Sequence, residues 1–457
     1  MRQPQRSSKP RLMQAMIDAF SLPDLRRKLL FTLAMLVVFR FVAHVSIPAV
    51  NQDALNALAS REAELPAVLG MLDIFSGGAL RTVSVAMMGV YPYITSTIIM
   101  QLLIPVIPRL AALQREGEAG RRKLNQYTHW LMVPLAFLQG YGQLILLHNQ
   151  EVTLASGETV RLVGDIGVSG GLLLPTLAMM LSMVAGTVFL VWLGERITES
   201  GIGNGISIII FGGIVSALPA NISGTFTSEG TFALVELLAL LVAIALLIVF
   251  VTEAVRRIPV QYSRSMFRGG KMYRQTGGTH IPLRVNSAGM IPLIFAYALL
   301  IFPSWIAQFF INSSTSWVAR GADIVNTLFS PEGYVYWLFL FLLVVGFAFF
   351  YTMVIFQQQN LAETLQRQGG FIPGIRPGRP TAEYLNKVIT RITWGGALFL
   401  AVVAVSPIIA RAITHTTSTT LMLVSSAGLL IVVGVVLDTM RQIEAQLLMR
   451  HYEGFIK

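Results

Sequence analysis

The stretch from residue 71 to residue 108 reads MLDIFSGGALRTVSVAMMGVYPYITSTIIMQLLIPVIP. Its first residues are mostly apolar, but Gly77, Gly78 and Arg81 interrupt the run before a clean apolar span begins near Val83. The pattern predicts a membrane segment whose helix is broken where it enters the bilayer. Backbone that is not continuous helix is tolerated at membrane depth only inside protein or beside a water-filled cavity. The stretch therefore predicts a pore, or a site around which the membrane must open.

The composition is that of a polytopic membrane protein. Of the 457 residues, 54% are hydrophobic and only 12% are charged, whereas soluble proteins carry roughly 25% charged residues. Cysteine is absent, which excludes a disulfide framework, a thiol nucleophile and a zinc–thiolate site. The six histidines are scattered and form no HExxH pair, so we expect no metal site and no cofactor.

Ten apolar stretches are long enough, or nearly so, for the ~20 residues that a helix needs to cross the hydrocarbon layer. They cover about residues 29–47, 83–107, 127–148, 172–193, 203–218, 232–251, 288–311, 334–356, 393–410 and 421–437. The sequence thus predicts an all-α membrane protein with ten transmembrane helices.

The distribution of Lys and Arg predicts that both ends of the chain lie in the cytoplasm. With the N-terminus inside, 28 of the 34 basic residues fall in cytoplasmic segments and 5 fall outside, as the positive-inside rule requires. Residues 1–28 form a basic, amphipathic cytoplasmic segment without a signal-cleavage pattern, and residues 438–457 form a cytoplasmic tail.

The predicted cytoplasmic loop at about 252–287 contains RRIPVQYSRSMFRGGKMYRQTGGTHIPLR. Aromatic and apolar residues flank the RGGK turn, which favours a β-hairpin. Its dense basic charge favours docking of an anionic partner, which could be RNA, an acidic protein or lipid headgroups. The alternative is an ordinary loop whose charges only set the topology.

The predicted cytoplasmic loop at about 357–392 contains FIPGIRPGRP. Proline stiffens this backbone while glycine turns it, so Arg376 is expected on a rigid tip, as a recognition residue would be. The alternative is a capped turn between helices, with Arg376 merely solvated.

Other polar features carry less functional weight. GIGNG at residues 201–205 lacks the preceding strand and the Gly-Lys-Ser/Thr of a phosphate-binding loop, so a helix cap is favoured. Arg40 falls inside the first span and is expected to pair or to reach the interface, a direct transport role being the alternative.

The residue types that are missing from the spans limit the possible functions of the chain. Their one carboxylate is Glu236, near an end, whereas ion-coupled transporters place acids or histidines near the midplane. A secondary transporter of a small solute remains the alternative to a conduit lined by aliphatic side chains, which fits better. An enzyme is not expected, because paired acids, a Ser/His pair and zinc ligands are missing from the spans.

Seven segments, in order along nearly the whole chain, closely resemble bacterial SecY, the central subunit of the protein-conducting channel. They read FSGGALRTVSVAMMGVYPYITSTIIMQLL, EGEAGRRKLNQYT, WLGERITESGIGNGISIIIFGGIV, RRIPVQY, AGMIPLIFA, FIPGIRPG and LLIVVGVVLDTM.

The resemblance implies two inverted, pseudo-symmetric five-helix halves, residues 29–218 and 219–437, around a central pore. It implies a plug helix at about 71–82. The implied plug residues are Phe75, Ser76, Gly77, Gly78, Ala79 and Leu80, and the implied pore ring is Val90, Ile94, Ile206, Ile210, Ile294 and Ile431. Val90 stands where isoleucine is common in the family, so the ring could be wider there.

The resemblance also implies a lateral gate with Thr95, Gln139 and Asn286 as its polar cluster, although serine is more usual at the Thr95 position. It implies docking of the SecA ATPase and the translating ribosome on Arg256, Arg257 and Arg376. The other implied partners are SecE, SecG, signal sequences, nascent polypeptides and anionic lipids, with no role for DNA. The implied location is the bacterial cytoplasmic (inner) membrane.

Overall fold

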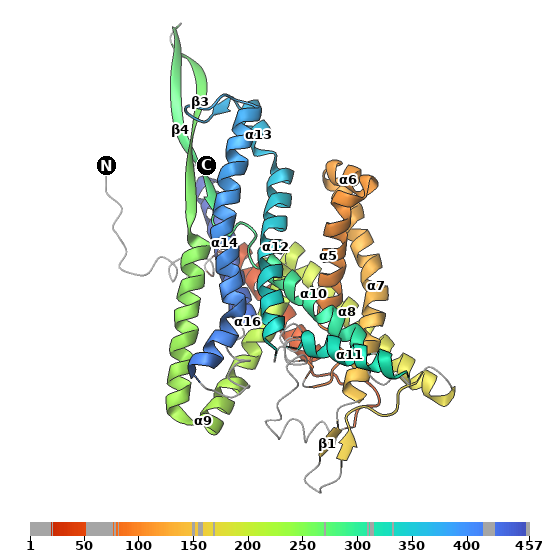
Figure 1. Cartoon of the computed structure of the whole chain (residues 1–457). Coiled ribbons are helices and arrows are strands. Elements are labelled where there is room, and N and C mark those ends of the chain that lie inside the picture. Colours follow the sequence, from red (N-terminus) through yellow and green to blue (C-terminus); the bar gives the residue numbers. More distant parts are fainter. Residues whose placement is uncertain are drawn as a thin grey trace. The chain divides into compact units, whose positions relative to one another are not determined.

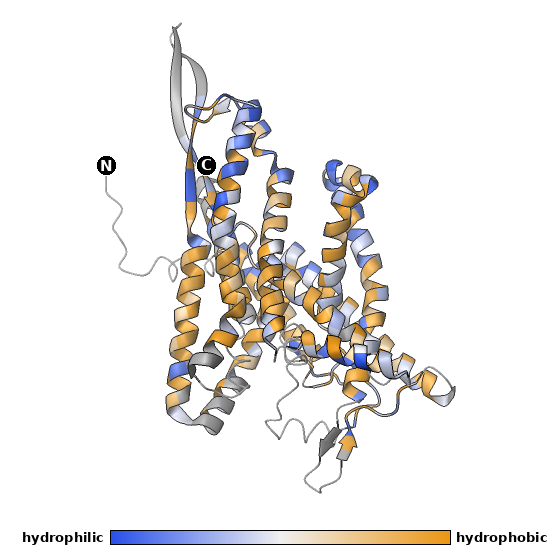
Figure 2. Cartoon of the chain, viewed as in Figure 1, coloured by the Kyte–Doolittle hydropathy of each residue, from blue (hydrophilic) through white to orange (hydrophobic). Residues whose placement is uncertain are grey.

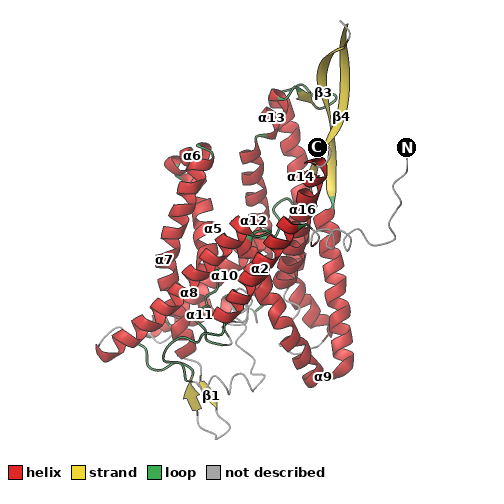
Figure 3. Cartoon of the chain, turned by 180° about the vertical axis from the view of Figure 1, so that it is seen from behind, coloured by secondary structure: helices red, strands yellow, loops and turns green. Residues whose placement is uncertain are grey.

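The structure is a computed structural model in which helices predominate (Figures 1 and 3). It describes residues 20, 22–51, 76, 79–80, 82–148, 151–153, 159–167, 170–268, 271–308, 310, 315–330, 333–414 and 426–453.

Each of the ten predicted apolar stretches overlaps a helix. These helices are α2 (Pro23–Val42), α5 (Tyr91–Val106), α7 (Glu118–His148), α8 (Leu173–Ser200), α9 (Gly205–Glu253), α10 (Ile291–Gln308), α12 (Tyr334–Gln359), α14 (Arg379–Thr414) and α16 (Ser426–Glu453). Two stretches fall in α9, whose backbone leaves the helical conformation at Gly230 (φ 84°). The shorter helices are η1 (Gly170–Leu172), α6 (Pro108–Arg115), α11 (Ser316–Leu328) and α13 (Leu361–Arg367).

The helices of the first two spans begin at other residues than the apolar stretches. Helix α2 begins at Pro23, upstream of the stretch that starts at residue 29, because proline lacks the N–H that would be unpaired in a first turn. Helix α5 begins at Tyr91, not at Val83. Positive φ angles at Val83 (43°) and Gly89 (56°) are incompatible with a helix over the intervening residues.

Several helices have the length and composition of membrane spans. Within the described residues five helices qualify, or six if α5 and α6, bent by 99°, form one span. Figure 2 shows that α12 is apolar over most of its length, and apolar side chains such as Leu338 (60% exposed) face outward on it. Exposed apolar surface on long helices fits contact with lipid, so the chain is a multi-pass membrane protein.

The chain forms two compact units. The first comprises Met1–Ser228, Trp305–Ile324 and Ile431–Lys457, and the second comprises Glu229–Ser304 and Val325–Leu430. Helices α5, α7 and α8 lie in the first unit, and α12 and α14 in the second. Helix α9 passes from one to the other next to its bend.

The second unit carries the predicted β-hairpin, which is confirmed. Strands β3 (Val255–Arg268) and β4 (Lys271–Arg284) pair antiparallel, with Arg268 opposite Lys271. A two-residue strand, β5 (Gly370–Phe371), pairs with β3 and completes a three-stranded sheet. Strands β1 (Glu151–Thr153) and β2 (Thr159–Arg161) form a separate small hairpin in the first unit.

One apolar core joins the hairpin to the loop at 357–392. Its buried members are Ile258, Val260 and Leu283 of the hairpin, Leu365 of α13, Ile372, and Leu385 and Ile389 of α14. The two predicted cytoplasmic loops are therefore parts of one folded module, next to α14 in Figure 1.

Candidate functional site

The residues predicted to break the second span, Gly77, Gly78 and Arg81, lie outside the described residues, and a series of turns is present just after them, over residues 82–90. Backbone hydrogen bonds close the turns from Val83 N–H to the Leu80 carbonyl (3.0 Å), from Met87 N–H to Ser84 (3.0 Å) and from Gly89 N–H to Ala86 (2.8 Å). The side chains of Val83 and Val90 are fully buried (0% exposed). The irregular backbone thus lies inside protein, as its amide groups require at membrane depth.

The turn segment is tied to the chain that follows α2. Ile47 N–H donates to the carbonyl of Val83 (3.0 Å), and Val85 N–H donates to the carbonyl of Val45 (2.8 Å). The Thr82 hydroxyl donates to the carbonyl of Ala43 (2.7 Å). Because these partners lie about 40 residues upstream, the end of α2 and the start of α5 hold one another in place.

The turn segment, residues 82–90, packs against two glycines on neighbouring helices, Gly186 and Gly140, which together we call its seat. A Cβ at Gly186 of α8 would lie 2.0 Å from the carbonyl oxygen of Val85, and one at Gly140 of α7 would lie 3.5 Å from the sulfur of Met88. Only glycine permits the first approach. The backbone of the turns therefore packs directly on α8.

Five of the six predicted ring residues lie in the first unit. Val90 precedes the first turn of α5 and Ile94 follows one turn later, where its N–H donates to the Val90 carbonyl (3.1 Å). Ile206 and Ile210 lie at the start of α9, and Ile431 of α16 is fully buried. Ile294 (9% exposed) lies on α10 in the second unit. The closed ring stays a prediction.

The predicted plug is described only in part. Phe75, Gly77 and Gly78 lie outside the described residues. Ser76, Ala79 and Leu80 are buried, with exposed fractions of 1%, 0% and 1%. Burial is what a stopper seated in protein would show, and its removal on opening stays a prediction.

Two of the three predicted gate residues are in contact. The Gln139 amide nitrogen on α7 donates to the hydroxyl of Thr95 on α5 at 3.1 Å, and the Thr95 hydroxyl donates to the Pro92 carbonyl at 2.9 Å. Gln139 is fully buried, yet its side-chain oxygen has no hydrogen-bond partner among the described residues. An unpaired buried acceptor costs about 1–3 kcal/mol, so this contact joins α5 to α7 at an energetic cost.

Asn286, the third predicted gate residue, belongs to the second unit. It is buried (6% exposed) and precedes α10. Gly396 of α14 lets this backbone come close, since a Cβ there would lie 2.4 Å from the carbonyl of Val285. The shared gate cluster stays a prediction.

Arg256 and Arg257 lie on opposite faces of the hairpin. Arg256 pairs with Leu283 and Arg257 with Pro282, and side chains alternate between faces along a strand. Because Leu283 is in the core, Arg256 shares the inner face, whereas Arg257 lies on the outer face. Both side chains are exposed, so the pair presents charge in two directions.

The loop that carries Arg376 is held at several points. Ile375 N–H donates to the Ile372 carbonyl (3.0 Å), and Gly374 has a φ of 84° that favours glycine. The Thr381 hydroxyl donates to the carbonyl of Arg376 (2.8 Å), and the Arg376 side chain is exposed. Arg376 therefore lies exposed on a loop closed by hydrogen bonds, and the rigidity of its tip stays a prediction.

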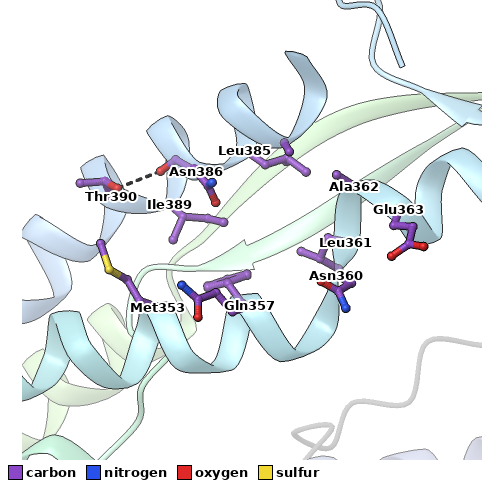
Figure 4. A pocket seen from close by; sticks show the side chains of 12 residues that line it. Met353, Gln357, Asn360, Leu361, Ala362, Glu363, Leu385, Asn386, Ile389 and Thr390 are labelled. Carbon is purple, nitrogen blue, oxygen red and sulfur yellow. Dashed lines mark hydrogen bonds between the residues drawn. The ribbon is translucent and has the colours of Figure 1, made fainter. Parts of the chain in front are cut away.

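A groove of about 440 Å³ lies between the end of α12, the start of α13 and α14 (Figure 4). Its lining is largely apolar, with the carboxamides of Gln357, Asn360 and Asn386. The lining acid, Glu363, pairs with Arg367 at 2.6 Å. Among the described residues no group of three or more His, Cys, Asp or Glu could hold a metal ion.

The pairing of β5 with β3 was missed by sequence reasoning. It joins Gly370 to Tyr262 across more than 100 residues, and the two residues of β5 are too few to show an alternating pattern. Gly370, one of the two residues of β5, was interpreted as a turn residue.

Comparison with known proteins agrees with these features. The SecY family model matches residues 84–440. The Protein translocase subunit SecY of Streptomyces lividans is 42% identical over 456 residues, covering 98% of this chain and 100% of the relative. That of Halalkalibacterium halodurans is 40% identical over 453 residues, covering 96% and 99%.

Solved channel structures share the fold. A SecY structure, described in terms of a plug domain that stabilises the closed channel, has a TM-score of 0.60 at 15% identity and covers 94% of this chain and 96% of that chain. Sec61 in the canine ribosome–channel complex has a TM-score of 0.56 at 15% identity with the same coverage. By family model and by relatives along its whole length, the chain belongs to the SecY family.

Proposed function

We propose that this chain is the protein-conducting channel of a bacterial cytoplasmic membrane, passing secretory polypeptides across it and releasing transmembrane helices sideways into lipid. Membership of a family of translocase subunits supports this function. The observation that carries it is the buried, non-helical segment at 82–90, which leads into α5 through Val90. Turns at the start of a span are tolerated at membrane depth only inside protein or beside a water-filled cavity, and the wall of a closed channel provides such a place.

The architecture we propose has ten spans in two inverted, pseudo-symmetric halves, residues 29–218 and 219–437. Both the basic segment 1–28 and the tail 438–457 lie in the cytoplasm. Ten apolar stretches with matching helices support the span number, and the excess of basic residues in the inside segments supports the orientation.

The pore is closed by an aliphatic ring and a plug. Val90, Ile94, Ile206, Ile210, Ile294 and Ile431 form the ring, and residues 71–82 form the plug. Branched aliphatic side chains repel water and ions, and they offer a moving polypeptide no fixed hydrogen-bond partner. Such a ring can seal at rest and still let side chains of many kinds pass.

The lateral gate runs beside Thr95, Gln139 and Asn286. An apolar segment that reaches the gate moves into lipid because it gains about 25 cal/mol for each Å² removed from water. This sorting is a partition equilibrium and needs no catalytic residue. The buried contact of Thr95 with Gln139 supports a role for these side chains in holding the gate closed.

The basic module on the second unit is the docking site for cytoplasmic partners. We assign contacts with SecA and with the translating ribosome to Arg256, Arg257 and Arg376, whose side chains are exposed. A solved relative of the same fold is in a ribosome–channel complex. SecE and SecG complete the assembly, anionic lipids surround it, and no cofactor is required.

Reconstitution tests the function directly. Proteoliposomes containing this chain with SecE and SecG are given SecA, ATP and a secretory precursor. Precursor should become protected from added protease only when ATP is present. Absence of protection at every ATP concentration, with the assembled complex present in the vesicles, would refute the proposal.

A further inference from the structure

The loop that carries Arg376 is attached to the hairpin by strand β5. Phe371 pairs with Gln261, and Gly370 pairs with Tyr262. These residues are the sheet contact between the two basic loops within the described residues. Together with the apolar core that joins the hairpin to this loop, the contact holds Arg376 near the hairpin arginines.

Tyr262 leaves room for no side chain at residue 370. A Cβ on Gly370 would lie 2.8 Å from Cε1 of the Tyr262 ring, 3.2 Å from Cδ1 and 3.3 Å from the Leu365 side chain. The Tyr262 ring is half-buried and packs against the core that contains Val260 and Ile372. The ring thus has little freedom to move away from a larger residue.

The position of strand β5 determines the position of Arg376, because the two are close together in the sequence. Only four residues separate Phe371 from Arg376, and among them Ile372 is buried (3% exposed). Beyond the tip, the buried Thr381 holds the carbonyl of Arg376. The segment between β5 and Arg376 is short and is closed by the hydrogen bond from Ile375 N–H to the Ile372 carbonyl (3.0 Å), so we expect a shift of β5 to move the arginine.

We propose that Tyr262 and Gly370 form a latch that positions Arg376 relative to the hairpin for partner docking. The latch rests on the proposed function, since it matters only if these arginines dock a partner. Tyr262 and Gly370 are positioning residues, and neither needs to touch the partner.

A distance measurement tests the latch without any partner. The chain has no cysteine, so nitroxide labels on His280→Cys and Arg376→Cys report one distance by electron-spin resonance. We expect a narrow distribution that becomes about twofold broader in Gly370→Ala, because the added methyl group forces its neighbours apart. Gly395→Ala is the matched control, since no atom lies within 4 Å of its Cβ. An unchanged distribution in Gly370→Ala refutes the latch.

A binding measurement tests whether the latch contributes to SecA binding, in a chain that carries no spin labels. Gly370→Ala should weaken SecA binding about tenfold, while Tyr262→Val with Gly370→Ala should bind as well as Tyr262→Val alone, because contacting residues are not additive. Additive losses, or a broadened distance with unchanged affinity, would overturn the proposal. If Arg376→Glu binds SecA normally, the docking function fails separately, and the distance measurement still decides whether the latch exists.

Discussion

Thr95 and Gln139 form a buried polar contact between α5 and α7. The sequence placed both on membrane spans but could not show that they touch, because α5 and α7 are separate helices whose facing sides depend on packing. The structure shows the hydrogen bond and also shows that the Gln139 oxygen lacks a partner within the described residues. The pair is therefore a marginal contact, which suits a gate that has to open.

Thr95→Val should lower the free energy of unfolding by about 1–3 kcal/mol, because it leaves the whole buried amide of Gln139 unpaired. The double substitution Thr95→Val, Gln139→Leu should recover most of this loss, since both polar groups are gone. Thermal unfolding of the purified complex measures the change. A double variant no more stable than Thr95→Val would contradict the role of the unpaired amide.

Arg376 is exposed on a loop closed by hydrogen bonds, and its docking role stays a prediction. Arg376→Glu should abolish SecA-driven transport and leave assembly with SecE and SecG intact, because reversing the charge repels an acidic partner surface. Lys387→Glu on α14, also exposed, is the matched charge-reversal control. Normal transport by Arg376→Glu would remove this residue from the docking site.

The turn segment and its seat are the element that the sequence described least completely. Gly77 and Gly78 indicated a break, but the turns at residues 82–90 were predicted as part of the span, because hydropathy alone does not distinguish buried turns from helix. The hairpin was predicted correctly from the apolar and aromatic residues around its turn. The pairing of the hairpin with β5 was not predicted, because pairing between residues so far apart in the sequence depends on the fold of the whole module.

Gly186→Ala should raise the resting ion conductance of vesicles severalfold. Its Cβ would lie 2.0 Å from the Val85 carbonyl, so the turns must move off α8. Alanine stabilises a helix by about 1 kcal/mol relative to glycine. A higher conductance would therefore result from the lost contact between α8 and the turns, and not from a weaker α8. Gly346→Ala on α12 meets no atom within 4 Å and should not leak. Equal conductance in the two variants would argue against the seat.

Replacing residues 71–82 by a flexible linker of the same length should also raise the resting conductance. The linker keeps the chain continuous but cannot close the pore as the plug does. Planar-bilayer recording of single channels measures the effect. A replacement variant as tight as the parent would show that the aliphatic ring seals without a plug.

At the scale of the molecule, the helical architecture could be predicted from the sequence because apolar length is a local property, and the family could be predicted from the resemblance of seven segments. The ring was implied by the same resemblance and stays a prediction, because Ile294 lies in a different unit from Val90 and Ile431. The channel function requires that a polypeptide pass these residues.

Photocrosslinking of a stalled precursor tests that passage. A photoreactive amino acid at Ile94 should form an adduct with the precursor only when SecA and ATP are present. The same amino acid at Leu246, 65% exposed on α9, should react with lipid and not with the precursor. Adducts at Leu246 as strong as those at Ile94, or none at Ile94 while the precursor is protected from protease, would contradict a pore lined by this ring.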